Sequence, residues 1–306
     1  MPREGSAGDG GRAQLRRVAA HLPFPFGEEL MDLLREHGGE EIRFRVGQPM
    51  LLRCRGGWRR GQTPLTAELL DGMLTRFCQG ALYAHRDSLV EGYVTLTDGC
   101  RVGVCGYAVT EDGRVVGVRD IRSLCVRLPA PIPQSVREAA ERIMPLLKED
   151  GNCRSVLLCG PPGSGKTTLL RAMAEGLSCP PNSRQTVVVD SRCELTPMLT
   201  PAKGCLDILT AYPRSVGIEI ALRTMAAEVI ICDEIGNAED AAAILRAQAC
   251  GVPLIASIHG EGWKTVRRRP MLAPLFEAES FGVCAELLRK PGESGFAMEI
   301  IRLWEP

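Results

Sequence analysis

The feature that most constrains this 306-residue chain is a glycine-rich segment near its middle, residues 160–167, which reads Gly-Pro-Pro-Gly-Ser-Gly-Lys-Thr. Before it lies a short apolar run, residues 156–158, that is typical of a buried strand. After it, leucine and methionine residues recur at the spacing of one helix face. In the order strand, glycine loop, helix, the pattern G-x-x-x-x-G-K-T predicts a phosphate cradle. The alternative, a glycine-rich turn before an ordinary helix, is disfavoured because every motif position is filled and both flanks fit.

The same segment predicts which groups would hold the phosphates. Glycine has no Cβ, so backbone N–H groups can turn inward around an anion, and the following helix adds its free N–H groups and the positive end of its dipole. Lys166 can then reach the β- and γ-phosphates, and the Thr167 hydroxyl can bind Mg²⁺. We therefore expect a nucleoside triphosphate site. The residues expected to line it are Gly160, Pro161, Pro162, Gly163, Ser164, Gly165, Lys166, Thr167 and Thr168.

Composition argues against several other classes of protein. Lysine plus arginine and aspartate plus glutamate both number 37, so the net charge of zero provides no field for nucleic acid or an anionic membrane. Aromatic residues, at 5%, are too few to suggest a base-stacking platform. The 13 cysteines lack the paired spacing of a metal site, which favours reduced thiols in a cytosolic protein. No run resembles a membrane span or a signal peptide, so we expect a soluble protein that meets membranes only through partners.

A proline-rich segment at residues 129–133 predicts a boundary between two domains. We expect residues 1–130 to form an α+β domain, with residues 1–12 disordered, and residues 131–306 to form the second domain. In the first, strands are expected at 41–46 and 50–53, and helices at 66–77 and ending near Glu91. A β-meander over 92–128 follows, with hairpin turns at Asp98-Gly99 and Asp112-Gly113.

In the second domain strands alternate with helices, which predicts an α/β class with a mostly parallel sheet. A helix at 134–148, shortened by Pro145, leads into the strand before the glycine loop. Further strands are expected at 186–190, 229–234 and 252–259. Asn237 is expected to cap the helix after the second of these, and Gly251 to end it. Two antiparallel strands, 281–289 and 296–304, are expected to close the domain.

Carboxylate and imidazole side chains end three of these strands. Asp233 is expected to hold Mg²⁺, and Glu234 to orient or deprotonate an attacking water. Asp190, followed by Glu194, and His259 end two other strands, and the carboxyl ends of parallel strands face the ligand crevice. The alternatives are a polar loop with a local ion pair at Asp190 and a structural role for His259.

Arg223 lies late in a predicted helix that precedes the strand ending in Asp233. It could supply charge to a transition state in its own or a neighbouring subunit, although most helix arginines are solvated surface residues. The same question arises more weakly for Arg119, Arg122 and Arg127. Arg267, Arg268 and Arg269 form a short basic cluster that could contact nucleic acid, although three adjacent arginines more often form an exposed face.

Four segments in order resemble the signatures of the type II/IV secretion and pilus ATPases, which are hexameric RecA-like P-loop enzymes. They are a Walker A segment at 160–167, an acidic box at 190–194, a Walker B segment at 229–234 and a His box at 257–260. Segments 41–49, 99–106 and 118–124, and Asp233-Glu234-Ile235-Gly236, are similar to a branch of these ATPases that acts in stage III of sporulation. The resemblance runs from about residue 14 to residue 305.

The resemblance implies a RecA-like P-loop NTPase domain, preceded by a smaller α+β domain. By this comparison Asp233 is the Walker B acid beside Thr167 at the metal. The residues implied to be catalytic are Lys166, Glu194, Arg223, Glu234 and His259, with Asp190 near the nucleotide. One departure stands out, because the family's D-E-R-S-E box reads Asp190-Ser191-Arg192-Cys193-Glu194 here. Turnover would then be slower, or Glu194 would carry the role alone.

The implied function is ATP hydrolysis, with ATP and Mg²⁺ as ligands, by a motor in the mother-cell cytoplasm that energises a secretion-like channel complex during sporulation. The implied partners are other copies in a homohexamer and membrane proteins of the stage III complex. Two alternatives stay open. One is an ATP-gated ring scaffold that does not hydrolyse ATP, and the other is a RecA-like nucleic-acid motor, which the zero net charge disfavours.

Overall fold

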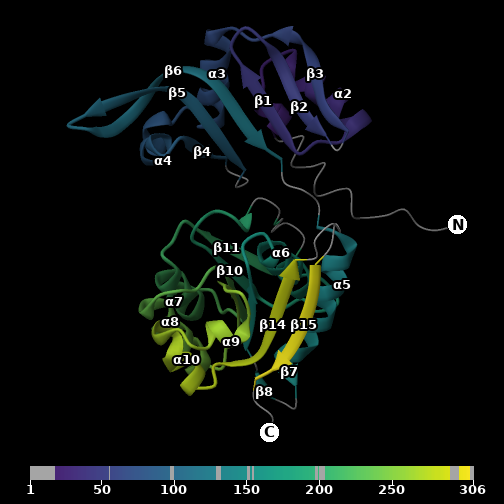
Figure 1. The fold of residues 1–306 in the computed structure, drawn as a ribbon, viewed down its shortest axis with the longest axis vertical. Coiled ribbons are helices and arrows are strands. Elements are labelled where there is room, and N and C mark those ends of the chain that lie inside the picture. Colours follow the sequence, from purple (N-terminus) through teal and green to yellow (C-terminus); the bar gives the residue numbers. More distant parts are fainter. Residues whose placement is uncertain are drawn as a thin grey trace, which may run out of the picture. The chain divides into compact units, whose positions relative to one another are not determined.

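The structure, a computed structural model, describes residues 18–54, 56–96, 100–128, 132–149, 152–153, 155–196, 199, 204–289 and 296–303. The chain divides into two compact units, Met1–Pro131 and Ile132–Pro306 (Figure 1). The segment expected to be disordered, residues 1–12, and the turn expected at Asp98-Gly99 lie outside the described residues. None of the helices in the described ranges combines the length and the apolarity needed to cross a bilayer.

A six-stranded antiparallel sheet forms the centre of the first unit, in the order β3-β2-β1-β6-β5-β4. Its strands are β1 (Glu41–Arg45), β2 (Pro49–Cys54), β3 (Gly57–Pro64), β4 (Tyr93–Thr95), β5 (Arg101–Glu111) and β6 (Arg114–Arg127). The alternation predicted for residues 41–46 is confirmed over β1, because Ile42 and Phe44 are buried while their charged neighbours are not; Val46, which follows the strand, is exposed. Strand β3 was not predicted, since its sequence has no apolar alternation; it lies at the sheet edge, paired to β2 through the backbone.

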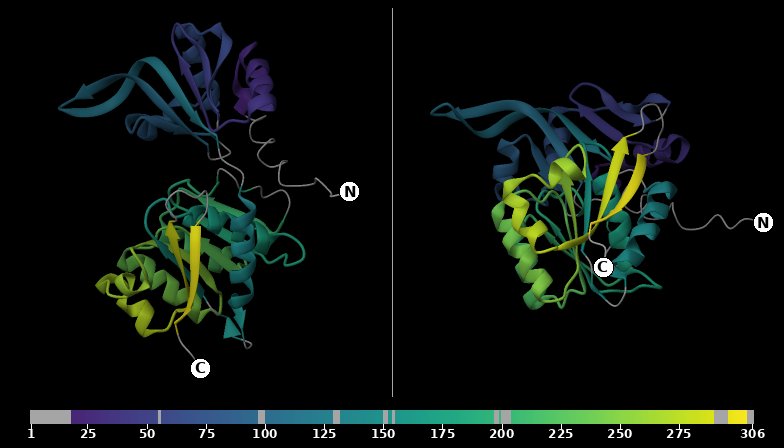
Figure 2. Two further views of the ribbon diagram at one scale, coloured as in Figure 1. Left: turned by 45° about the vertical axis from the view of Figure 1, so that its right-hand side comes forward. Right: turned by 60° about the horizontal axis from the view of Figure 1, so that its bottom comes forward.

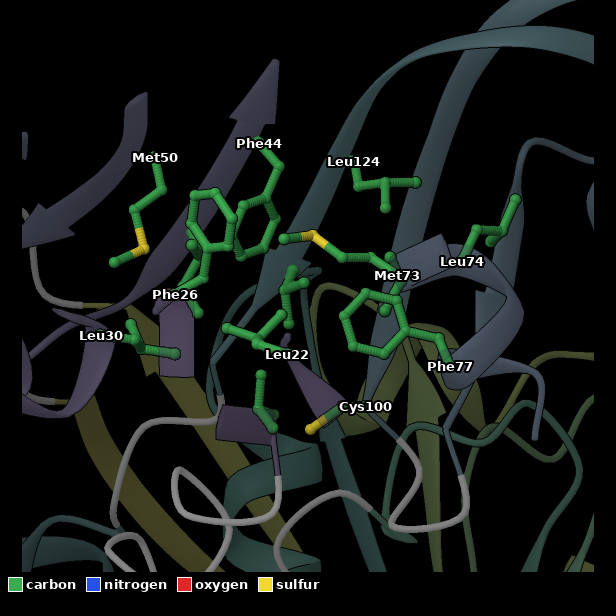
Figure 3. Close-up of a cluster of buried hydrophobic side chains, with 14 of the residues drawn as sticks. Leu22, Phe26, Leu30, Phe44, Met50, Met73, Leu74, Phe77, Cys100 and Leu124 are labelled. Atoms are coloured by element: carbon green, nitrogen blue, oxygen red, sulfur yellow. The ribbon is translucent and has the colours of Figure 1, made fainter. Parts of the chain in front are cut away.

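Helices cover one face of this sheet: α2 (Phe26–His37), α3 (Ala67–Phe77) and α4 (Arg86–Val90), the last preceded by a short 3₁₀ turn, η1 (Leu82–His85). Helix α3 begins where predicted, and the Thr66 side chain caps it by accepting from the Leu69 N–H group. Figure 3 shows the resulting core, in which Phe26 and Leu30 of α2, and Met73 and Phe77 of α3, meet side chains of the strands. Helices α2 and α3 therefore form because an apolar stripe on each is buried in this core, whereas α4 has no buried residue.

The β5–β6 hairpin continues well beyond the rest of the sheet as a two-stranded arm (Figure 1). None of the residues from 105 to 120 is buried, and Tyr107 is about half exposed. The guanidinium groups of Arg119 and Arg122 lie 5.9 and 4.9 Å from the centre of the Tyr107 ring. The turn predicted at Asp112-Gly113 joins the two strands of the arm.

The second unit contains a seven-stranded sheet in the order β11-β10-β12-β13-β9-β14-β15. Its strands are β9 (Ser155–Gly160), β10 (Thr186–Asp190), β11 (Leu206–Thr210), β12 (Val229–Cys232), β13 (Leu254–His259), β14 (Phe281–Arg289) and β15 (Phe296–Arg302). All neighbours pair in parallel except β14 and β15, which are antiparallel as predicted. A separate two-stranded hairpin consists of β7 (Lys148–Glu149) and β8 (Asn152–Cys153).

Helices lie on both faces of the second sheet (Figure 2). They are α5 (Gln134–Ile143), α6 (Lys166–Ser178), α7 (Arg214–Thr224), α8 (Ala238–Ala249), α9 (Trp263–Val266) and α10 (Ala273–Glu277), with 3₁₀ turns η2 (Met144–Leu147) and η5 (Pro270–Leu272). Alternate residues of β9 point to opposite faces, so Leu158 packs with α5 and α6 while Leu157 packs with α7, α8 and α10. Pro145 shortens α5 as predicted, and the Asn237 side chain caps α8 by accepting from the Asp240 N–H group.

Candidate functional site

The glycine loop connects the end of β9 to the start of α6. Gly163 and Gly165 have positive φ angles of 73° and 95°, which glycine adopts without strain. The hydroxyl of Ser164 is buried and has no hydrogen-bond partner in the structure. Gly160 leaves no room for a side chain, since an added Cβ would lie 2.5 Å from the Leu287 carbonyl oxygen. A loop with open glycines and an orphaned inward hydroxyl fits a phosphate group.

Lys166, the first residue of α6, points back into this loop. Its Nζ atom donates to the carbonyl oxygens of Gly160 (2.8 Å) and Pro161 (2.9 Å) and lies 3.1 Å from His259 Nδ1. The residue is only 4% exposed. Burial lowers the pKa of the Lys166 ammonium group, and the nearby carboxylates of Asp233 and Glu234 offset this only in part. A buried cation held by neutral oxygens is suited to exchange them for a phosphate.

The acidic residue that follows β12 lies beside the start of α6. The Thr167 hydroxyl donates to Asp233 Oδ2 at 3.1 Å, and the Ser257 hydroxyl donates to Asp233 Oδ1. An octahedral Mg²⁺ ion binds oxygens at about 2.0–2.1 Å, so adjacent ligand oxygens lie about 3 Å apart, close to the Thr167–Asp233 separation. The described residues contain no group of three or more His, Cys, Asp or Glu side chains that could hold a metal by itself. An ion here would therefore need phosphate or water oxygens as further ligands.

Glu234 is held by contacts from two directions. His259 Nε2 contacts Glu234 Oε1, and Arg192 forms an ion pair with Glu234 Oε2. A lysine ammonium group can only donate, so His259 Nδ1 accepts from Lys166 and Nε2 carries the proton that is donated to Glu234. The Glu234 backbone has a positive φ of 50°, a conformation that costs a non-glycine residue about 1–3 kcal/mol. Strain of this kind persists only where the surroundings enforce it.

Asp190, at the end of β10, is hydrogen-bonded within its own loop. It is buried, and its carboxylate accepts hydrogen bonds from the backbone N–H groups of Glu194 (2.9 Å), Leu195 (2.9 Å) and Thr196 (2.7 Å) and from the Thr196 hydroxyl (2.5 Å). These contacts fold the 190–196 loop onto the strand end. The backbone carbonyl of Glu194 also accepts from Arg171 of α6. In the described structure Asp190 thus shapes the loop that carries Glu194 and does not contact the glycine loop.

Helix α7 contributes an arginine that the sequence analysis did not select. Arg214 Nε donates to the Asp233 carbonyl oxygen and Arg214 Nη1 to Asp240 Oδ2, both at 2.6 Å. Arg223 lies exposed in the last turn of the same helix, which rises about 1.5 Å per residue, so it is about 13 Å along α7 from Arg214. The structure therefore does not bring Arg223 to the other candidates within one chain. Its catalytic role stays a prediction that concerns a neighbouring subunit.

The structure thus brings Lys166, Thr167, Asp233, Glu234 and His259 to the carboxyl ends of three adjacent strands, β12, β13 and β9. Sequence reasoning missed Arg214 and named Arg192 and Ser257 only as members of the acidic box and the His box, without the contacts that they make. The position of Ser257, two residues before His259 on β13, was a usable signal because alternate residues of a strand share a face.

The fold belongs to a known class. It superposes on the ATPase DotB of Legionella pneumophila with a TM-score of 0.57 and 18% identity, covering 93% of this chain and 82% of that one. It superposes on the pilus retraction motor PilT with bound ADP with a TM-score of 0.58 and 20% identity, covering 90% and 82%. The chain therefore has the RecA-like α/β fold of secretion ATPases, preceded by an antiparallel-sheet unit, as predicted.

The sequence comparisons then identify the family. The family model "Sporulation stage III, protein AA" matches residues 28–300, and the chain belongs to this family. It is 36% identical over 273 residues to stage III sporulation protein AA of Bacillus subtilis, covering 83% of each chain. It is also 31% identical over 169 residues to the uncharacterized protein ycf45 of Porphyra purpurea, covering 53% of this chain and 29% of that one. The predicted resemblance to a sporulation branch is confirmed.

Proposed function

We propose that this protein is a Mg²⁺-dependent ATPase that works as a motor of the secretion-ATPase kind. The observation that carries the proposal is the meeting of Lys166, Thr167, Asp233, Glu234 and His259 at one edge of the second sheet. A phosphate-loop lysine, a hydroxyl beside a buried carboxylate, and a second carboxylate next to them are the parts that phosphoryl transfer to water requires.

Each of these residues has a role that follows from its contacts. The glycine loop and Lys166 bind the phosphates, while Thr167 and Asp233 hold the metal side of the site. Mg²⁺, when bound, would neutralise charge on the phosphate oxygens. Glu234 orients and deprotonates the attacking water, and His259 fixes the direction of the Glu234 carboxylate. Glu194 is our proposed additional carboxylate on the loop shaped by Asp190.

A second candidate, an ATP-gated ring scaffold without turnover, is supported by the contacts of Glu234. Both of its carboxylate oxygens are engaged, one by His259 and the other by Arg192. With both oxygens already engaged, the carboxylate has less hydrogen-bonding capacity left for an attacking water. The presence of Ser191 in the acidic box, in place of the family's glutamate, also favours a scaffold without turnover.

The biological setting that we propose rests on membership of the sporulation family. We infer a homohexameric ring in the mother-cell cytoplasm, recruited to the membrane by membrane proteins of the stage III channel complex. The nucleic-acid motor is the less supported alternative, because the net charge is zero. The mass of the protein in solution, with and without ATP, tests the ring.

The decisive variant for the ATPase is Glu234→Gln, which keeps the shape of the side chain but removes the base. We expect the rate of ATP hydrolysis to fall by about 10²-fold or more, while affinity for ATP changes little. The matched control is Glu239→Gln, on the exposed first turn of α8, which should hydrolyse ATP like the wild type. Wild-type protein that binds ATP with Mg²⁺ but shows no turnover would instead support the scaffold, and turnover unaffected by Glu234→Gln would exclude Glu234 as the base.

A further inference from the structure

The backbone turn that carries Asp233 and Glu234 is held by a buried ion pair between two helices. Arg214, the first residue of α7, contacts Asp240, in the first turn of α8, at 2.6 Å. Their side chains are only 11% and 2% exposed. Such a pair is costly to desolvate, and its stabilising effect depends on how completely its hydrogen-bonding groups are used.

Arg214 and Asp240 are hydrogen-bonded to the two ends of the Asp233–Gly236 turn. Arg214 Nε donates to the Asp233 carbonyl oxygen at 2.6 Å, and Asp240 Oδ2 accepts from the Gly236 N–H group at 3.1 Å. Glu234, between these two contacts, has the strained positive φ of 50°. From strand β13 the Ser257 hydroxyl accepts from the Glu234 N–H group at 3.0 Å. The turn is therefore constrained by both helices and by β13 at the point where its backbone is least favourable.

The same two helices share a second ion pair that does not touch the turn. Arg246 of α8 contacts Glu219 of α7 at 2.5 Å, with side chains 51% and 43% exposed. Both pairs join α7 to α8, but of these four residues Arg214 and Asp240 are the two that the described structure shows hydrogen-bonded to the Asp233–Gly236 backbone. The Arg246–Glu219 pair therefore serves as a control, because removing it weakens the contact between α7 and α8 without removing a hydrogen bond to the turn.

We propose that Arg214 and Asp240 are positioning residues for the acidic turn. They hold the backbone so that Asp233 faces Thr167 and the metal side of the site, and Glu234 faces His259. Neither residue touches the reacting groups; they act through the turn. The inference rests on the proposed function, and it predicts an effect on Mg²⁺-dependent nucleotide binding as well as on turnover.

The test is the double variant Arg214→Gln/Asp240→Asn, which removes both charges and so leaves no unpaired buried ion. Affinity for a fluorescent ATP analogue is measured with Mg²⁺ and with EDTA, alongside kcat and KM for ATP. Residues that orient metal ligands typically change metal affinity or activity by about 10–100-fold, so we expect kcat and the Mg²⁺-dependent gain in affinity each to fall by about 10-fold. Affinity in EDTA should stay within about two-fold, since the glycine loop is untouched.

The control Glu219→Gln/Arg246→Gln should retain the wild-type kcat and the wild-type increase in ATP affinity when Mg²⁺ replaces EDTA, which we call the Mg²⁺ gain. Arg214→Lys keeps the charge but loses the forked donor, so it should show a smaller loss of kcat and of the Mg²⁺ gain than the double variant. If circular dichroism shows that the double variant does not fold, Arg214→Lys takes its place. The proposal is overturned if a folded Arg214 variant keeps both the wild-type kcat and Mg²⁺ gain, or if the control loses as much. If the wild type binds Mg²⁺-ATP without turnover, the proposed hydrolysis is refuted. The increase in ATP affinity on adding Mg²⁺, compared between variant and wild type, then tests the positioning role by itself.

Discussion

At Lys166, burial and hydrogen bonding act in opposite directions on one ammonium group. The three acceptors around Nζ favour the charged form, yet its pKa is lowered because the residue is buried. The proposed phosphate site therefore holds a cation at some expense to the folded state. This is the usual conflict between stability and function at a binding site.

Lys166→Met should consequently stabilise the fold while weakening nucleotide binding. The folded-state pKa lies below the unfolded value of about 10.4, so the penalty is present while both states carry the proton and is lost as pH rises from the folded-state pKa to the unfolded value. We expect the melting temperature of the variant to exceed that of the wild type by about 2–4 °C at pH 7, with a smaller difference near pH 10. Thermal melts at the two pH values check this.

Lys264→Met is the matched control, because Lys264 is exposed on α9 and should show no pH-dependent difference. A melting temperature for Lys166→Met that is lower than that of the wild type at pH 7 would mean that the hydrogen bonds of Nζ outweigh its burial. The same conclusion would follow from a difference that does not change with pH.

At the scale of single elements, the arm formed by β5 and β6 differs from every other hairpin of the first sheet in having no buried residue along residues 105–120. Two-stranded hairpins are marginally stable on their own, since they lack a hydrophobic face that packs on a core. The arm should therefore contribute little to the stability of the unit that carries it.

Replacing residues 109–117 with Asn-Gly keeps the Ala108–Val118 pair and closes the strands with a two-residue turn. We expect the melting temperature to change by no more than about 2 °C, because no buried side chain is removed. Thermal denaturation followed by circular dichroism measures it. A loss of more than about 5 °C would show that the arm packs against the rest of the protein.

Over the whole molecule, the hydrophobic clusters divide cleanly between the two units. One cluster runs from Val18 to Leu128, and the two on either face of the second sheet draw only on residues from Ile132 onward. Each unit therefore buries a core of its own, which is the condition for independent folding.

A fragment of residues 132–306 should accordingly fold and bind nucleotide without the first unit. We expect one cooperative thermal transition and an affinity for ATP within about ten-fold of the full chain, since the contacts of Lys166 and Thr167 described above lie inside this fragment. Circular dichroism and titration with a fluorescent ATP analogue test this. A fragment without a cooperative transition would show that the second core is incomplete.

Local sequence patterns predicted most of the second sheet and its order of strands and helices. Strand β10 spans the residues expected, and the caps at Thr66 and Asn237 form because a side-chain oxygen three residues before a backbone N–H group is a local arrangement. Strands β3 and β11 were missed, since their positions depend on pairing with neighbours rather than on apolar alternation. The fold class followed because alternating strands and helices admit few packings.

The features of the candidate site likewise fall into two groups, those predicted from local sequence and those that only the structure revealed. The sequence by itself determined the phosphate loop and the acidic strand end, because each is a short contiguous pattern whose chemistry depends on adjacent residues. Only the tertiary structure decided that Arg214 and Ser257 hold the acidic turn, and that His259 contacts both Lys166 and Glu234. These contacts join residues 19 or more positions apart, and a distance of that kind is set by the order of strands in the sheet, which no local pattern encodes.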